Sequence, residues 1–170
     1  SRAKDFVNRR FTGYIISVRR LSHVDARGEA AMVDGSAKPV QLRHAVARGE
    51  IRMNRATLKL VRSNRVAKGN VLATARVAGI LAAKKTGELI PLCHPLPITH
   101  CEVDFSFPKS GDRIVITAAA KIAAQTGVEM EALTAVSVAA LTIYDMCKAA
   151  DKGMRIQGVY LVSKTKRPVF

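Results

Sequence analysis

Asp145 and Lys148 are a pair of side chains whose types and spacing suit proton transfer. They stand three positions apart in a stretch with helical periodicity, so both lie on one helix face. Such a pair is usually a solvated surface contact. However, residues 141–144 and 146–147 around it are mostly apolar, which predicts partial desolvation, mutually tuned pKa values and a general acid and base.

Two acidic residues, Glu129 and Glu131, begin the same predicted helix. Acidic side chains near a helix N-terminus complement the helix dipole. This effect explains the presence of one carboxylate well and of a second less well. Residues two positions apart on a helix point to different faces. The two carboxylates are therefore expected to converge on one site only if Glu129 precedes the regular helix.

His94 lies in a loop, residues 91–97, that three prolines stiffen into an extended path. A lone histidine is more often structural than catalytic. Cys93, His94, His100 and Cys101 would be a four-ligand metal set, but each pair is directly adjacent, whereas zinc ligands are normally spaced further apart. His100 and Cys101 also face opposite ways in a strand. This spacing disfavours a metal site.

A basic segment is another candidate for ligand binding. Its charges recur mostly every three or four residues, which favours a stripe along a helix. They are Arg52, Arg55, Lys59, Arg62, Arg65 and Lys68. The stripe is either a solvated helix face or a rim that binds the phosphates of a nucleotide or of RNA.

The composition favours a folded domain with an anionic partner. The 170 residues are 48% hydrophobic, which excludes a disordered chain, and the net charge is +15. Residues 1–67 contribute +10 of it. Three cysteines without a CxxC pair indicate a reducing compartment, and no uncharged apolar run is long enough to predict a membrane span.

The elements that must position these side chains follow from periodicity and capping signals. We predict strands at 40–53, 101–107, 114–118 and 154–164, and helices from the N-cap Asn54 to 61, from Asn70 to 85 with Gly87 just beyond its end, and over 129–150. This order predicts the α+β class, a ferredoxin-like split βαβ sandwich whose antiparallel sheet has its helices packed on one face.

A sheet covered by helices on one side leaves its other face open. We expect many apolar positions on that face, and we therefore expect a homo-oligomer.

Several stretches resemble one family closely. They are residues 31–34, 37–38, 68–69, 89–96 and, above all, 126–134 and 141–149, which read TGVEMEALT and LTIYDMCKA. They are similar to the molybdenum cofactor biosynthesis protein C family, the cyclic pyranopterin monophosphate synthases, from about residue 21 to residue 164.

The resemblance implies an activity and an assembly. The family converts (8S)-3′,8-cyclo-7,8-dihydroguanosine 5′-triphosphate, a cyclised derivative of GTP, to cyclic pyranopterin monophosphate and releases pyrophosphate. It has the ferredoxin-like fold and forms a hexamer, a trimer of dimers, with each site at a subunit interface. No cofactor is expected, and a divalent cation accompanying the triphosphate is left open.

The family's functional residues carry over by position. Asp145 and Lys148 match the acid/base pair, and the surrounding substrate pocket is matched by Asp34, Lys68, Leu92, Cys93, His94, Glu129, Met130, Glu131 and Lys164. Cations at 68, 148 and 164 would absorb the charge that develops on pyrophosphate. Glu131 and His94 are expected to hydrogen-bond the guanine-derived ring.

The chain departs from the family pattern at three places. Gly35 replaces the usual Val, Asn70 replaces an Asp, and KTKRPVF replaces a glycine-rich C-terminal tail. We expect a basic tail at 1–20, one catalytic domain at 21–164 and a divergent tail at 165–170. The location is cytoplasmic, or the mitochondrial matrix if residues 1–20 are a targeting remnant, which Asp5 disfavours.

The main alternative is an RNA-binding module, because a ferredoxin-like fold and a basic chain are also typical of RNA-recognition domains. These stack bases on aromatic residues of the central strands, whereas residues 113–118 contain none and aromatic residues total 5%. A nucleic-acid partner is therefore disfavoured. An inactive homologue of the synthases is the third alternative.

Overall fold

The computed structural model describes residues 29–30, 32–33 and 36–169. The chain divides into two compact units, residues 1–33 and 34–170, and the elements below belong to the second. Asp34, Gly35 and the predicted tail at 1–20 lie outside the described residues.

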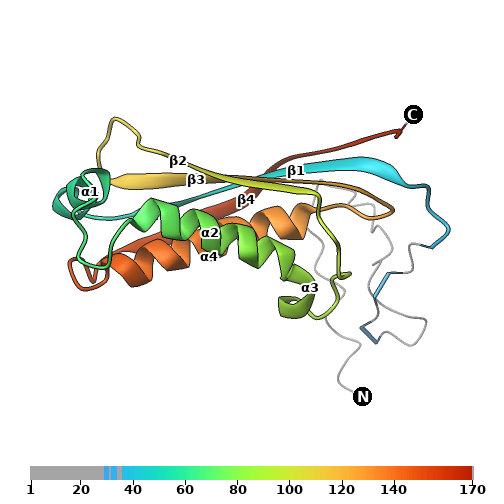
Figure 1. Cartoon of the computed structure of the whole chain (residues 1–170), viewed down its shortest axis with the longest axis horizontal. Coiled ribbons are helices and arrows are strands. Elements are labelled where there is room, and N and C mark those ends of the chain that lie inside the picture. The colour runs from blue at the N-terminus through green and yellow to red at the C-terminus, as the bar shows by residue number, and fades with distance from the viewer. Residues whose placement is uncertain (1–28, 31, 34–35, 170) are drawn as a thin grey trace, which may run out of the picture. The chain divides into compact units, whose positions relative to one another are not determined.

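Four antiparallel strands form one sheet in the order β2-β3-β1-β4 (Figure 1). The strands are β1 (Gln41–Arg52), β2 (His100–Ser106), β3 (Arg113–Ala124) and β4 (Arg155–Arg167). The long strands β1 and β3 lie in the centre, and helices connect β1 to β2 and β3 to β4. This is the predicted ferredoxin-like arrangement.

Asparagine caps begin the first two helices as the sequence predicts. Asn54 accepts a hydrogen bond from Thr57 N at 2.8 Å before α1 (Arg55–Arg62), and Asn70 accepts one from Ala73 N at 3.0 Å before α2 (Val71–Lys84). An asparagine therefore satisfies an otherwise unpaired N–H at the start of α2, as an aspartate in its place would.

The longest helix, α4 (Glu129–Cys147), packs against the sheet and beside α2 (Figure 1). Small residues allow the two helices to approach closely: Ala75, Gly79, Ala82 and Ala83 on α2 and Ala132, Ala135, Ala139 and Ala140 on α4 are buried. A Cβ at Gly79 would lie 2.9 Å from the carbonyl oxygen of Ala135. We call this contact the small-residue seam.

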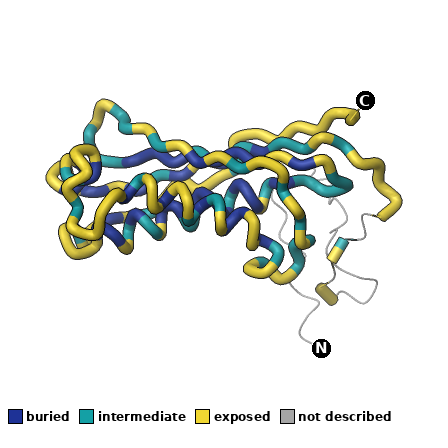
Figure 2. Tube along the Cα trace, viewed as in Figure 1, coloured by how far each residue is buried: buried dark blue, intermediate teal, exposed yellow. Residues whose placement is uncertain are grey.

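The core lies between this helix layer and the sheet. Its strand positions alternate, so that Ala45, Ala47 and Ile51 of β1 are almost completely buried against the helices. The buried residues follow the sheet and the inner sides of the helices, whereas β4 is largely exposed (Figure 2).

The open face of the sheet carries both polar and apolar side chains. The positions that alternate with the buried ones bring together Glu50, Arg113 and Gln157, which are joined by hydrogen bonds of 2.6 to 3.2 Å. On β2, His100 Nε2 lies 3.7 Å from Glu102 Oε2 on the same face. Among the apolar side chains of this face, Val115 and Ala119 are buried, whereas Leu42 and Tyr160 are about half exposed.

Several predicted boundaries differ from the observed ones. β3 runs to Ala124 instead of 118, β4 continues to Arg167, and α4 ends at Cys147. The short helix α3 (Thr86–Leu89) was not predicted. Gly87 is not a left-handed cap; it lies inside α3, where a Cβ would come within 2.8 Å of Pro95 Cα.

In the described part of the chain, α4 is a helix with the length and hydropathy to cross a membrane. Half of its 18-residue window is buried against the rest of the protein. It is therefore a core helix of this fold, in agreement with the sequence analysis.

Candidate functional site

Asp145 holds two ammonium groups at the C-terminal end of α4. Its Oδ1 lies 2.7 Å from Lys148 Nζ, and its Oδ2 lies 2.9 Å from Lys68 Nζ. Lys68 also donates to the main-chain oxygen of Asp145 at 3.0 Å. The predicted pair is thus a triad, which we call the Asp145 cluster (Lys68, Asp145 and Lys148).

The three side chains are about half exposed, at 48%, 55% and 56%. The predicted desolvation of Asp145 and Lys148 is wrong for the single chain, because the apolar neighbours Ile143, Met146 and Cys147 point into the core from the opposite side of the helix. Hydrogen bonds from Lys148 and Lys68 lower the pKa of Asp145 to about 2, and Asp145 raises the pKa of Lys148.

Asp145 and Lys148 are both charged at neutral pH, and these pKa shifts reinforce that state. A carboxylate with so low a pKa is ionised at neutral pH and is a weak base, whereas Lys148 is a protonated donor. The cluster can therefore deliver a proton and bind an anion.

A cavity of about 310 Å³ lies beside the cluster. Its lining is mostly apolar and includes Leu60, Val66 and Met146, and Arg65 and Lys68 contribute two cations. Such a mixture suits a flat ring carrying an anionic group.

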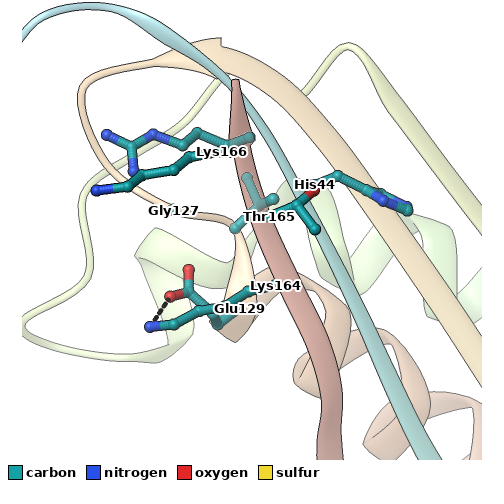
Figure 3. A pocket seen from close by; sticks show the side chains of 8 residues that line it. His44, Gly127, Glu129, Lys164, Thr165 and Lys166 are labelled. Carbon is teal, nitrogen blue, oxygen red and sulfur yellow. Dashed lines mark hydrogen bonds and ion pairs between the residues drawn. The ribbon is translucent and has the colours of Figure 1, made fainter. Parts of the chain in front are cut away.

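Glu129 and Lys164 form an ion pair of 2.9 Å at the other end of α4 (Figure 3). The glutamate folds back over Gly127, where a Cβ would lie only 1.8 Å from Glu129 Oε2. Burial raises the pKa of Glu129, but the hydrogen bond from Lys164, a main-chain hydrogen bond and the positive charges of Lys164 and Arg43 together outweigh burial and leave the pKa below its usual range. The absence of a side chain at Gly127 thus leaves room for the Glu129 carboxylate to pair with Lys164.

A pocket of about 250 Å³ surrounds this pair. It is lined by Arg43, His44, Gly127, Val128, Glu129, Lys164, Thr165 and Lys166 (Figure 3). We call it the Lys164 pocket.

The sequence analysis did not single out Arg43 or Lys166 for this pocket. The strand alternation offered one signal for Arg43. It lies on the same face of β1 as the buried Ala45 and Ala47, where a guanidinium needs hydrogen-bond acceptors. Arg43 finds them in the carbonyl oxygens of Ala124 and Gln125, at 3.4 and 3.1 Å, and so fixes the connection between β3 and α4.

Glu131 is only 2% exposed and lies near Glu129 and Cys93. Burial and the negative charge of Glu129 raise its pKa, so it takes up a proton more readily than an ordinary glutamate. Burial and the Glu131 charge likewise raise the pKa of the Cys93 thiol. Both glutamates belong to α4, so Glu129 does not precede the regular helix, and their negative charges interact.

The loop before β2 carries Leu92, Cys93 and His94, all partly exposed. Met130 is 37% exposed at the start of α4. In β2, His100 pairs with Lys121 on the open face and Cys101 with Ala120 on the helix face, as predicted. Within residues 29–30, 32–33 and 36–169, no three His, Cys, Asp or Glu side chains are gathered to hold a metal ion.

The predicted site residues form two groups in the single chain. Glu129 and Asp145 are 16 residues apart on one helix, a separation of about 24 Å at 1.5 Å per residue. The first group lies around Glu129, with Glu131, Lys164 and Cys93, and the second is the Asp145 cluster. One chain does not bring them together.

The basic stripe is present on the outer face of α1. Arg55, Lys59 and Arg62 are exposed, and the Arg62 guanidinium lies 5.3 Å from the ring centre of Phe107. Arg52 forms an ion pair with Asp112.

Residues 32–167 match the MoaC family. A cyclic pyranopterin monophosphate synthase of Chloroflexus aggregans is 57% identical over 148 residues, 87% of this chain and 90% of that protein. One of Parvibaculum lavamentivorans is 53% identical over 150 residues, 88% and 94% of the two chains. A third synthase, from Thermomicrobium roseum, is 57% identical over 144 residues, which cover 85% of this chain and 87% of that protein.

Proposed function

The chain belongs to the MoaC family, and from this premise we propose that it is a cyclic pyranopterin monophosphate synthase, a lyase of molybdenum cofactor biosynthesis. Its substrate is the cyclised GTP derivative (8S)-3′,8-cyclo-7,8-dihydroguanosine 5′-triphosphate, and it releases pyrophosphate. One observation carries this proposal: more than half of the aligned residues, over most of the chain, are identical to those of relatives that are named for this activity.

The complete active site contains residues of two copies of the chain. The Asp145 cluster and the Glu129 group are about 24 Å apart in one copy, too far for one nucleotide-sized ligand to be held closely by both. A hexamer, a trimer of dimers, with the C-terminal end of one α4 near the N-terminal end of another would join them. Contact with a second copy would also desolvate the exposed Asp145 cluster and strengthen its electrostatic interactions.

Lys148 is the proton donor, and Asp145 holds it in place. Ring formation from a purine-derived skeleton requires proton transfers to and from the reacting atoms. Lys148 is protonated at neutral pH, as an ordinary lysine is, and its ammonium group lies 2.7 Å from Asp145 Oδ1. Lys68, held by the other carboxylate oxygen, stabilises negative charge on the departing pyrophosphate.

The second group binds the substrate. Glu131, with its raised pKa, and His94 hydrogen-bond the guanine-derived ring, while Leu92, Cys93 and Met130 contact it. Lys164 contributes positive charge toward the phosphates, and Glu129 positions it. Asp34, which lies outside the described residues, is assigned to substrate binding by its match to the family alone.

We further propose that the enzyme is cytoplasmic and needs no resident cofactor. The three lysines at 68, 148 and 164 supply positive charge that a divalent cation would otherwise bring to the triphosphate. Turnover in the presence of EDTA is therefore expected.

One assay tests the function. The purified protein is incubated with the cyclised GTP precursor, and pyrophosphate and the pterin product are measured together. Stoichiometric formation of both is expected. Binding of the precursor without either product would leave an inactive homologue as the correct description.

A further inference from the structure

Lys166 lies directly opposite Arg43 in the register between β4 and β1. Side chains at opposite positions of antiparallel strands are about 5 Å apart at Cβ, and like charges placed there destabilise the sheet. Two residues earlier on β4, Lys164 extends to the same side of the strand as Lys166 (Figure 3). Three cations therefore face one small region.

The nearby carboxylate does not neutralise them. Glu129 is committed to Lys164 at 2.9 Å, and Arg43 is held by the carbonyl oxygens of Ala124 and Gln125. Lys166 makes no ion pair or side-chain hydrogen bond with any residue that the structure describes. A positive charge thus remains at the rim of the Lys164 pocket without a counter-ion from that part of the chain.

The charge of Lys166 is carried by the regular strand β4. Residues 165–167 continue β4 and remain paired with β1, so the main chain at Lys166 is fixed against the pocket. The lysine consequently needs to order only its own side chain to bind a ligand, which lowers the entropy cost of binding.

We propose that Lys166 binds a terminal phosphate or diphosphate group in the Lys164 pocket and so increases the affinity of this chain for its triphosphate substrate. The identity of the substrate rests on the proposed function, whereas binding of the diphosphate group rests on the pocket alone. The volume of about 250 Å³ is below the ~300–1,000 Å³ of sites that enclose whole drug-sized molecules. It fits a phosphate chain better than an entire nucleotide.

His44 is not part of this phosphate-binding set. Although it lines the pocket, its side chain extends to the other side of the sheet from Lys164 and Lys166 (Figure 3).

The experiment compares Lys166→Gln with Lys109→Gln, a matched loss of one charge. Lys109 is exposed in the turn between β2 and β3, at the opposite end of the sheet from the pocket. Pyrophosphate binding is measured by calorimetry, and KM and kcat for the cyclised precursor are measured at low and high salt. Lys166→Arg tests whether a cation alone restores binding.

Lys166→Gln is expected to weaken pyrophosphate binding and raise KM by about 5- to 20-fold, with kcat within about two-fold of wild type. The difference should fall below about two-fold in 0.5 M NaCl, where exposed charges are screened. Lys166→Arg should keep most of the affinity.

Equal behaviour of Lys166→Gln and Lys109→Gln in both measurements would overturn the proposal. If wild-type protein makes no product but binds pyrophosphate through Lys166, the proposed function fails and the anion site stands. If Lys166→Gln changes KM without changing pyrophosphate affinity, the diphosphate assignment is wrong.

Discussion

Lys68 contacts Asp145 at two atoms, 2.9 Å from the carboxylate Oδ2 and 3.0 Å from the main-chain oxygen. The two residues are 77 positions apart, so this contact fixes the segment before α2 to the end of α4. Because Lys148 uses the other carboxylate oxygen, the position of both lysines depends on one side chain.

Asp145→Asn should therefore reduce turnover by about 100-fold or more, because both lysines lose the carboxylate that holds them in place. The melting temperature should change by less than about 2 °C, since exposed ion pairs add little stability. Pyrophosphate release and calorimetry measure the two effects. Asp104→Asn, which removes an exposed ion pair with Arg76, is the control and should retain activity. Equal activities of both variants would exclude the role given to Asp145.

The separation of the two groups on α4 predicts complementation between inactive variants. Lys68→Ala impairs one end of α4 and Glu129→Gln impairs the other. Mixed assemblies refolded together should regain up to about a quarter of wild-type activity, because random pairing leaves some sites with two intact halves. Activity of the co-refolded mixture is compared with that of each variant alone. No recovery in assemblies shown to contain both chains would place the whole site in one copy.

Gly127→Ala tests the close approach of Glu129. A methyl group there would occupy the position of Glu129 Oε2, so the carboxylate must rotate away from Lys164. We expect KM to rise by about 10-fold, the cost of losing one charge-assisted contact. Gly153→Ala is the matched control, because its nearest neighbour would be 3.4 Å away. Unchanged kinetics of Gly127→Ala would show that the ion pair does not position Lys164.

Glu131→Gln should stabilise the protein at high pH. The folded-state pKa of Glu131 is raised above 4.5, so the folded protein holds a proton that the unfolded chain releases. Stability is consequently lost as the pH rises from 4.5 through the raised pKa, and a glutamine escapes this loss. The variant should match wild type near pH 4.5 and melt about 2 °C or more higher at pH 8. A constant difference across this range would show that Glu131 is not the titrating group.

The sequence predicted the fold more completely than the site. Asn54 and Asn70 revealed two helix starts because a side-chain cap is a local signal. The helix α3 was missed because it has only four residues, follows α2 directly and has no side-chain cap at its start. Gly87 was interpreted as the residue just beyond a helix end. The structure places it inside α3 in close contact with Pro95, a tertiary contact that the local sequence does not reveal.

The site residues were named before the structure, but their arrangement was not. Glu129 and Asp145 were both placed on one predicted helix, and the rise per residue already implied that they lie far apart. The exposure of Asp145 was mispredicted because apolar neighbours in sequence point to the other side of a helix. Arg43 and Lys166 meet only through the pairing of β1 with β4, which a linear pattern does not contain.

The small-residue seam has a consequence for both ends of α4. Alanine and glycine have no side-chain rotamers, so closing the contact between α2 and α4 loses almost no side-chain conformational entropy on folding. Because these residues have no alternative rotamers, the two helices can pack in few other ways once the small-residue seam has formed. α4 therefore acts as a rigid spacer, and thermal fluctuations of the Asp145 cluster and of Glu129 relative to each other should be small.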